Sequence, residues 1–197
     1  MKRHPIKYIW AFRSILYKPF FKHVGNMSYI GRPCFIEGCK GISIGSKTRI
    51  FPGIRMEAIG NGEIIIGDNC AIEQNVHITS ADIQLIIEDD VTVLANTYIT
   101  NLNHNYENIE NSILEQGYRV KRTQIGKGCF IGFGAAIQAG TILGAHCVVG
   151  AHSVVKGTFP DYCVIVGAPA RIIKRYDKNT KQWVKWGRYE DKEKTNL

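Results

Sequence analysis

The sequence predicts an all-β fold, a parallel β-helix of six-residue repeats, and two observations carry that prediction. Aliphatic residues recur at steps of six near the C-terminus: Ile125, Ile131, Ile137, Leu143, Val149 and Val155. Glycine follows four of them, at Gly126, Gly132, Gly144 and Gly150. Neither an α-helix, with its period of 3.6, nor simple strand alternation selects every sixth residue. Each unit is therefore expected to be a short strand plus a turn, with three units closing a triangular coil.

Shorter runs with the same period precede this one and are separated by small insertions. They are Ile30, Ile36, Ile42; then Ile44, Ile50; then Ile66, Ile72, Ile78; then Ile87, Val93, Ile99. In a triangular coil each aliphatic residue points inward and stacks on its equivalent three units later, as Ile125 would on Leu143. The repeat therefore predicts one continuous core along a prism.

Four of the six cysteines lie four residues after a repeat aliphatic, where other units carry Ala135 and Ser153: Cys34, Cys70, Cys129 and Cys147. A narrow corner of a coil admits only small side chains, so these thiols are expected to be packing residues. Cys39 and Cys163 fall outside this pattern and receive no role. The chain has no C-x-x-C pair and no secretory signal, which favours a reducing, cytoplasmic location.

The two ends of the chain differ from the repeat. Residues 1–28 form a basic segment whose apolar residues recur at helical spacing: Tyr8, Ile9, Phe12, Ile15, Leu16 and Phe20. Its uncharged runs are too short to span a bilayer. One interpretation is a helix that caps the domain; the other is an amphipathic segment, residues 1–22, lying on the inner membrane face. The charged tail, 175–197, carries two tryptophans and is expected to form a short helix before a frayed end.

The net charge is +8 over 197 residues, and the positive residues concentrate in the first 25 residues and after Arg171. Such a balance suits nucleic acid, an anionic membrane or a polyanionic small ligand. No arginine-rich arm or zinc-finger spacing is present, so nucleic acid is not expected as a partner.

The repeat stops at NLNHNY, and a polar loop over 101–124 opens with His104 near its start. An interruption of this size in a regular solenoid is typical of a functional insertion.

The repeat [ILV]-G-x-x-x-x, the loop with NHNY, and the segment VIVGAPARIIK at 164–174 together resemble the hexapeptide-repeat acyltransferases. These are left-handed parallel β-helix enzymes. The resemblance covers about 29–174 and is greatest to bacterial O-acetyltransferases of sugars and surface polysaccharides. It implies an acetyl-CoA-dependent O-acetyltransferase acting on a sugar hydroxyl, on a small-molecule or lipid-linked saccharide of O-antigen, capsule or exopolysaccharide synthesis.

The resemblance also implies a homotrimer with active sites between subunits, and roles for individual residues. His104 matches the general base, which takes the proton of the attacking hydroxyl. Positions that bind the acceptor sugar match Glu73, Asn75 and Asp82. Positions that meet the pantetheine arm or the phosphates of the coenzyme match Phe133, Ala151, Lys156, Arg171 and Lys174.

Several alternatives stay open at this point. Acetyltransferases that modify streptogramin or chloramphenicol-type antibiotics share the repeat and the histidine loop, and an amino-sugar N-acetyltransferase has a similar pattern. A non-catalytic β-helix scaffold would not bind coenzyme A at all. No metal site is expected, because His146 and His152 are one unit apart and project from different faces of the triangle.

Overall fold

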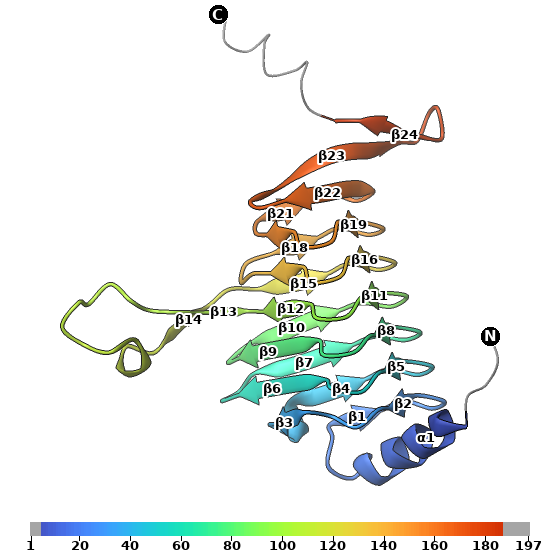
Figure 1. The fold of residues 1–197 in the computed structure, drawn as a ribbon, viewed down its shortest axis with the longest axis vertical. Coiled ribbons are helices and arrows are strands. Elements are labelled where there is room, and N and C mark those ends of the chain that lie inside the picture. The colour runs from blue at the N-terminus through green and yellow to red at the C-terminus, as the bar shows by residue number, and fades with distance from the viewer. Residues whose placement is uncertain (1–4, 187–197) are drawn as a thin grey trace, which may run out of the picture.

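The computed structural model describes residues 5–186, which wind as a left-handed parallel β-helix (Figure 1). The coils stack in one column, a helix lies across the N-terminal end, and one long arm projects from the middle. The all-β prediction is therefore confirmed. Residues 1–4 and 187–197, which belong to the two end segments of the sequence prediction, lie outside the described range.

Three parallel sheets form the faces of the prism. Sheet A contains β1 His23–Val24, β4 Ile42–Ile44, β7 Glu63–Ile66, β10 Gln84–Ile87, β15 Thr123–Ile125, β18 Ile142–Leu143 and β21 Thr158–Phe159. Sheet B contains β2 Tyr29–Ile30, β5 Arg49–Ile50, β8 Ala71–Ile72, β11 Thr92–Val93, β16 Phe130–Ile131, β19 Val148–Val149 and β22 Cys163–Gly167. Sheet C contains β3 Phe35–Glu37, β6 Arg55–Ile59, β9 His77–Ala81, β12 Tyr98–Thr100, β17 Ala136–Ile137 and β20 Val154–Val155. The chain visits A, B and C in turn, which defines an A–B, a B–C and a C–A corner.

The strand register confirms the predicted stacking in the last coils. Ile125 pairs with Leu143, Ile131 with Val149, and Ile137 with Val155, and all six side chains are buried. Coils before the arm are longer. There Ile44 pairs with Ile66 and Ile66 with Ile87, because β6 and β9 are five residues long and a wider turn follows each at the C–A corner.

Close approach between coils explains the glycine that follows the repeat aliphatic. A Cβ built on Gly126 would lie 2.7 Å from the backbone carbonyl carbon of Gly144 in the next coil. No side chain fits at that distance, so the corner requires glycine.

Small residues do fill the A–B corner, where Cys70, Cys129 and Cys147 are buried. Each thiol donates a hydrogen bond to a carbonyl of the next coil, as the Cys129 Sγ does to the Gly144 oxygen at 3.1 Å. Cys163 continues this column four residues after the buried Phe159, although the repeat pattern assigned it no role. The packing prediction is wrong for Cys34, which is exposed because it lies in the first coil with no coil beneath it.

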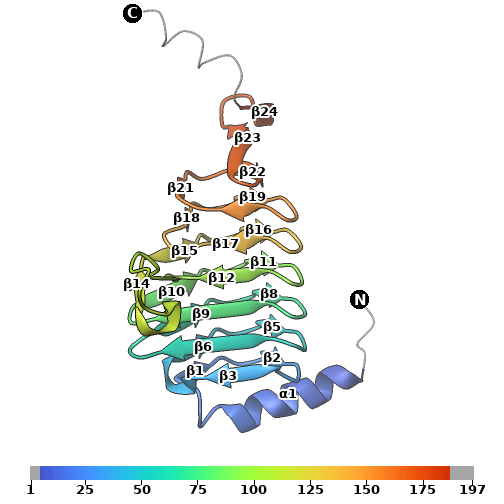
Figure 2. The same ribbon diagram turned by 60° about the vertical axis from the view of Figure 1, so that its left-hand side comes forward.

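The predicted N-terminal helix is confirmed as α1, Ile6–Tyr17, and the first strand, β1, begins at His23 (Figure 2). None of the helices within residues 5–186 is long and apolar enough to cross a membrane.

The expected short helix after Arg175 is wrong for the described residues, 175–186. This segment instead continues β23, Ala170–Asp177, and returns antiparallel as β24, Gln182–Lys185. The Asp177 carboxylate accepts the backbone N–H of Asn179 at 2.8 Å, which fixes the turn. The aromatic residues favour the hairpin because Tyr176 and Trp183 pack across the two strands with ring centroids 5.6 Å apart.

Candidate functional site

The break in the repeat is an ordered arm at the C–A corner. After β12 the chain leaves the prism as β13, Leu102–His104, and returns as the antiparallel β14, Tyr118–Val120 (Figure 1). A short 3₁₀ turn, η2 at Ile113–Glu115, lies near the tip; the other such turn, η1 at Cys39–Gly41, lies in the first coil. His104 is the last residue of β13, pairs with Tyr118 and is exposed. Within residues 5–186 no side chain hydrogen-bonds its imidazole.

The base of the arm is fixed by Asn101, which is fully buried. Its side-chain oxygen accepts the backbone N–H of Ala81 at 2.8 Å, and its amide donates to the Ser80 hydroxyl at 3.0 Å. The amide also approaches the carbonyls of Ala81 and Ile83 at 3.2 and 3.3 Å. The Asn101 carbonyl accepts the N–H of Lys121 on the returning strand at 2.7 Å. One residue thus connects the exit and return of the arm to each other, through its backbone, and to the coil below, through its side chain.

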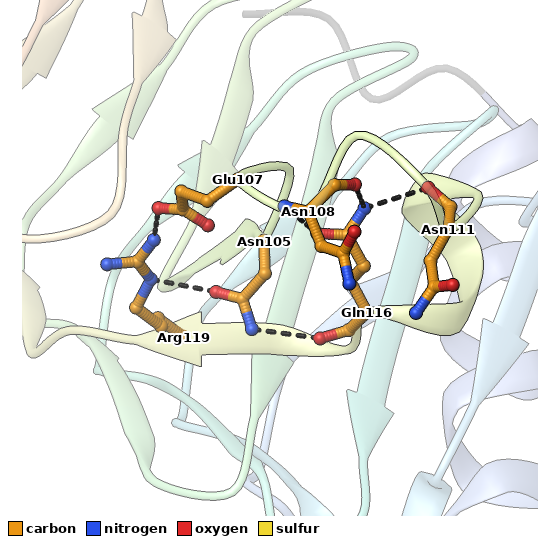
Figure 3. Close-up of a pocket in the computed structure, with 6 residues that line it drawn as sticks. All are labelled: Asn105, Glu107, Asn108, Asn111, Gln116 and Arg119. Atoms are coloured by element: carbon orange, nitrogen blue, oxygen red, sulfur yellow. Dashed lines mark hydrogen bonds and ion pairs between the residues drawn. The ribbon is translucent and has the colours of Figure 1, made fainter.

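Polar side chains hold the outer part of the arm together, as Figure 3 shows. Arg119 donates to the Asn105 side-chain oxygen at 2.7 Å and forms an ion pair with Glu107. Gln116 donates to the carbonyls of Asn108 and Asn111 at 2.8 and 3.0 Å. These residues line a polar hollow of about 530 Å³ that does not include His104. The hollow therefore belongs to the arm's own packing, while His104 stays free at its base.

Of the predicted acceptor residues, Asp82 lies at the same corner of the prism as the arm that carries His104. Asp82 lies at the C–A corner after β9, in the coil below the arm. Burial, together with the Asp82 charge and the hydrogen bond that the Tyr118 hydroxyl donates to Asp82, raises the pKa of Tyr118, the residue paired with His104. Asp82 therefore lies beside Tyr118, the cross-strand neighbour of His104 in the arm.

Glu73 and Asn75 lie elsewhere, at the B–C corner between β8 and β9. The Glu73 carboxylate accepts the backbone N–H of Ala95 at 3.2 Å, and the Asn75 amide donates to Asn96 at 3.2 Å. Asn75 also has φ +56°, a left-handed conformation that asparagine tolerates in turns. Both residues stabilise a corner that is different from the one His104 occupies in the same chain. Their role in acceptor binding stays a prediction.

Of the five residues predicted to meet the coenzyme, two lie at that B–C corner, two lie on a strand above it and one lies elsewhere. Phe133 and Ala151 occupy it in successive coils, about 5 Å apart along the prism. Above them, Arg171 and Lys174 lie on β23, which pairs with β22 at the end of sheet B. Lys156 is the exception, since it follows β20 and lies at the C–A corner. The corner therefore carries an aromatic ring, Phe133, and a small residue, Ala151, and the cations Arg171 and Lys174 lie nearer the C-terminal end of the prism.

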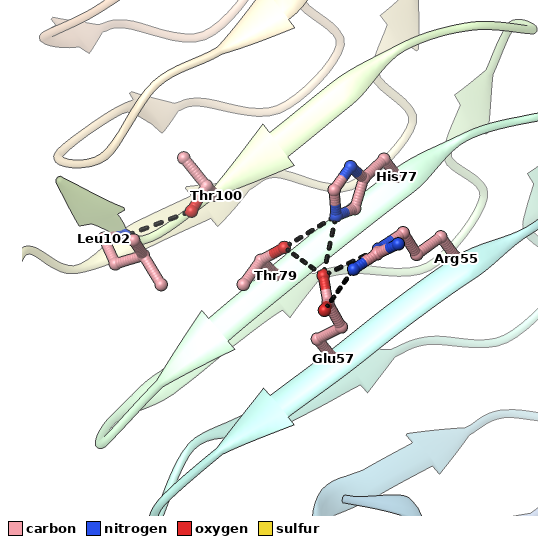
Figure 4. Close-up of polar contacts among 6 residues, drawn as sticks. All are labelled: Arg55, Glu57, His77, Thr79, Thr100 and Leu102. Atoms are coloured by element: carbon pink, nitrogen blue, oxygen red, sulfur yellow. Dashed lines mark hydrogen bonds and ion pairs between the residues drawn. The ribbon is translucent and has the colours of Figure 1, made fainter. Parts of the chain in front are cut away.

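A cluster on the outer face of sheet C was not identified from the sequence (Figure 4). The Arg55 guanidinium donates to both oxygens of Glu57, at 2.7 and 3.0 Å, and the His77 Nε2 lies 2.8 Å from the same carboxylate. The Thr79 hydroxyl donates to it at 3.2 Å. Thr100, which accepts the N–H of Leu102 at 3.1 Å, stands above Thr79 in the register. The cluster therefore continues up to the base of the arm.

The Glu57 carboxylate gives a prediction for acid stability. Its hydrogen bond from Arg55, and then that from His77, lower its pKa to about 2 from an ordinary value of 4.5. A lowered pKa in the folded state stabilises the fold above the unfolded pKa, and this stabilisation is lost as the pH falls from about 4.5 to 2. The free energy of unfolding of wild type should exceed that of Glu57→Gln by about 1–2 kcal/mol at pH 6. Urea unfolding of both proteins at pH 6 and pH 3 measures this gap, which should narrow at pH 3; a constant gap would contradict the assignment.

Within residues 5–186 no group of three or more His, Cys, Asp or Glu side chains is placed to hold a metal ion. His146 stacks on Tyr162 and His152 packs edge-on against Phe133, each at its own corner of the prism.

The comparisons with known proteins agree with this architecture. Residues 122–157 match the family described as bacterial transferase hexapeptide (six repeats), and residues 63–80 match the hexapeptide repeat of succinyl-transferase. The chain is 32% identical over 185 residues to the putative lipopolysaccharide biosynthesis O-acetyl transferase WbbJ of Escherichia coli K12, covering 81% of this chain and 85% of the relative.

Two solved structures are similar in fold. A mutant of AntD, an N-acyltransferase from Bacillus cereus in complex with dTDP and coenzyme A, has a TM-score of 0.72 at 21% identity, covering 85% of this chain and 91% of that one. Galactoside acetyltransferase in complex with coenzyme A has a TM-score of 0.61 at 22% identity, covering 91% and 76%. With its six-residue repeat, its interrupting arm and its likeness to WbbJ over most of both chains, the chain belongs to the hexapeptide-repeat acetyltransferases.

Proposed function

We propose that the protein transfers an acetyl group from acetyl-CoA to a sugar hydroxyl during surface polysaccharide synthesis, with His104 as the general base. The observation that carries this proposal is the position of His104. It stands exposed at the base of an arm that interrupts the coil, and buried Asn101 anchors that base. The likeness to an O-acetyl transferase of lipopolysaccharide biosynthesis supports the acceptor class.

The chemistry requires one base and an oriented thioester. The hydroxyl oxygen attacks the thioester carbonyl carbon, and the His104 imidazole takes the hydroxyl proton as the C–O bond forms. When the C–S bond breaks, the same proton passes to the departing thiolate, so that ester and coenzyme A thiol leave. Backbone N–H groups suit the transient oxyanion. No covalent enzyme intermediate is needed because the thioester is already activated.

The proposed site is shared between two copies of the chain. His104 lies at the C–A corner, whereas Phe133 and Ala151 lie at the B–C corner of the same prism, with a sheet between them. The arm projects away from its own prism and exposes apolar side chains near its tip: Tyr106, Ile109, Ile113 and Leu114. In a cyclic trimer, the arm of one copy would lie over the B–C corner of the next.

Mixing two inactive variants tests this arrangement. His104→Ala removes the base, and Ala151→Trp places a bulky side chain at the exposed B–C corner, where it should block the pantetheine arm. Trimers reassembled from equal amounts should regain about a quarter of wild-type activity, because one interface in four combines an intact arm with an intact corner. Acetyl transfer by the mixture measures this. No recovery, despite exchange of subunits shown by differently tagged copies, would mean that each site lies within one chain.

The acceptor is tested with a panel. Acetyl-CoA cleavage should rise in the presence of a nucleotide-linked or lipid-linked sugar, and the product should lose its acetyl group in mild base, as an ester does. An alkali-stable amide would instead indicate an amino-sugar N-acetyltransferase, an alternative favoured by the fold similarity to AntD. Turnover only with streptogramin or chloramphenicol-type antibiotics would replace the sugar acceptor. Failure to bind coenzyme A would indicate a scaffold.

A further inference from the structure

Helix α1 packs against the prism in an unusual orientation. Ser14 is the only buried residue of the helix, and its hydroxyl lies 2.8 Å from the carbonyl of Ser28. Arg13 donates to the carbonyl of Ile30 at 3.2 Å, and Trp10 packs against Tyr29 with ring centroids 5.7 Å apart. The face toward the protein is therefore polar and aromatic, with most of its hydrogen bonds made to backbone.

The opposite face of α1 is apolar and points away from the protein. Six large apolar side chains, on the helix and just beyond it, are each more than half exposed: Tyr8, Ile9, Phe12, Ile15, Leu16 and Phe20. A helix that only capped the prism would bury its apolar stripe against the first coil. A contiguous exposed surface of this kind marks an interaction site. We name these six residues the outer face of α1.

An apolar groove extends this surface. It has a volume of about 660 Å³ and lies between the end of α1 and the first coil. Its lining includes Tyr17, Phe20, Phe21, Phe35 and Ile36. Because Phe20 belongs to both, the outer face and the groove form one continuous apolar surface at the N-terminal end of the prism.

The charge around this surface is mostly positive. Residues 1–36 contain seven Lys or Arg and no Asp or Glu. On the described part of the chain, Lys18 is bound only to the Asn26 side chain and Lys40 to the carbonyl of Pro19, so neither is paired with an acid. Lys22 is the basic residue here that faces an acid, Glu63. An apolar helix face surrounded by cations complements the headgroups and acyl chains of an anionic bilayer.

We propose that the outer face of α1 docks the protein on an anionic lipid surface, with the column of coils standing away from it. The helix crosses the N-terminal end of the column (Figure 2), so its outer face is a flat base. In the trimer proposed above, rotation about an axis along the column brings three such helices to the same end. One amphipathic helix binds lipid weakly, and three act together through avidity.

Docking fixes the height of the site, a consequence that rests on the proposed function. The arm leaves the coil of β12, three coils above β3, which is about 15 Å at the spacing of parallel strands. The helix adds about 10 Å of thickness. His104 would then stand roughly 25 Å above the lipid surface. This height suits an acceptor of several sugar units on a lipid carrier rather than a single sugar at the headgroup.

Flotation of the full-length protein with vesicles tests the docking directly. Wild type should float with phosphatidylcholine vesicles that contain phosphatidylglycerol and remain in solution with phosphatidylcholine alone. The double variant Phe12→Glu/Ile15→Glu should reduce the floated fraction about tenfold or more, since two apolar side chains that enter the bilayer in the docked protein are replaced by charges. Val184→Glu is the control. It changes an exposed apolar residue on β24, at the opposite end of the column from α1, and should float like wild type.

Two further measurements separate the remaining outcomes. Phe12→Trp should gain a fluorescence contribution that brominated acyl chains quench, which surface attraction by charge alone would not produce. The oligomeric state of the double variant without lipid should equal that of wild type. A changed state would mean that a second copy of the chain covers this face, and equal flotation of the double variant and wild type would mean that α1 does not dock. None of these readouts depends on acetyl transfer, so they stand apart from the proposed function.

Discussion

Replacing His104 with alanine should lower the rate of acetyl transfer by about 10²–10⁴-fold while coenzyme A binding is retained. The side chain is exposed and, within residues 5–186, makes no hydrogen bond, so its removal leaves no unsatisfied group in the fold. Only the proton acceptor for the sugar hydroxyl is lost. The measurement is kcat for the acceptor found in the panel, together with the Kd for coenzyme A.

His23→Ala is the matched control for this experiment. His23 is also an exposed histidine on a short strand, β1, but it lies in the first coil, at the N-terminal end of the prism and away from the arm. Its variant should keep wild-type kcat. If His104→Ala retained activity within a factor of ten of wild type, the assignment of the general base would be wrong, and the proton would have to leave by another group of the arm.

Asn101→Ala should lower both stability and activity. Removing this buried side chain leaves the N–H of Ala81 without its acceptor and removes the hydrogen bond that the Ser80 hydroxyl accepts, although that hydroxyl still donates to the Ile83 carbonyl. The loss costs about 1–3 kcal/mol of unfolding free energy. The base of the arm then loses its connection to the coil below, and His104 loses its fixed position. A displacement of about 1 Å at a reacting group costs up to about 10²-fold in rate. Thermal unfolding and kcat of the purified variant measure the two effects.

The comparison for Asn101 is Asn61→Ala. Asn61 is an exposed asparagine in the turn after β6, in the same column of corners two coils below the arm. It should change stability by less than about 0.5 kcal/mol. Equal stability losses in the two variants would show that Asn101 acts as an ordinary turn residue. A stability loss with unchanged kcat would show that it supports the coil and not the position of His104.

The sequence alone determined the coil and the place where it breaks. Inward positions such as Ile125 and Leu143 repeat locally, every six residues, so each unit reports its own strand and turn. The same period predicted His104 as a candidate functional residue, because the histidine stands where the repeat stops. Residues in the first and last segments were harder to interpret. Tyr176 and Trp183 pair across a hairpin whose two strands extend the stacked sheet. The expectation of a helix did not take into account that this segment could pair with that sheet.

The tertiary structure decided which residues meet. Coils of different length precede the arm, so only the stacked prism shows that Asp82 shares a corner with His104 and that Asn75 does not. Asn101 looks like any loop asparagine until the coil below supplies Ala81 as its partner. The orientation of α1 likewise depends on the first coil. Ser28 and Ile30 have backbone carbonyls that accept hydrogen bonds from polar residues of the helix, so the polar face turns inward and the apolar face turns outward. The period can be read within a short stretch of the chain. Contacts at the corners instead join residues that are far apart in the sequence, so they depend on how separate repeats stack.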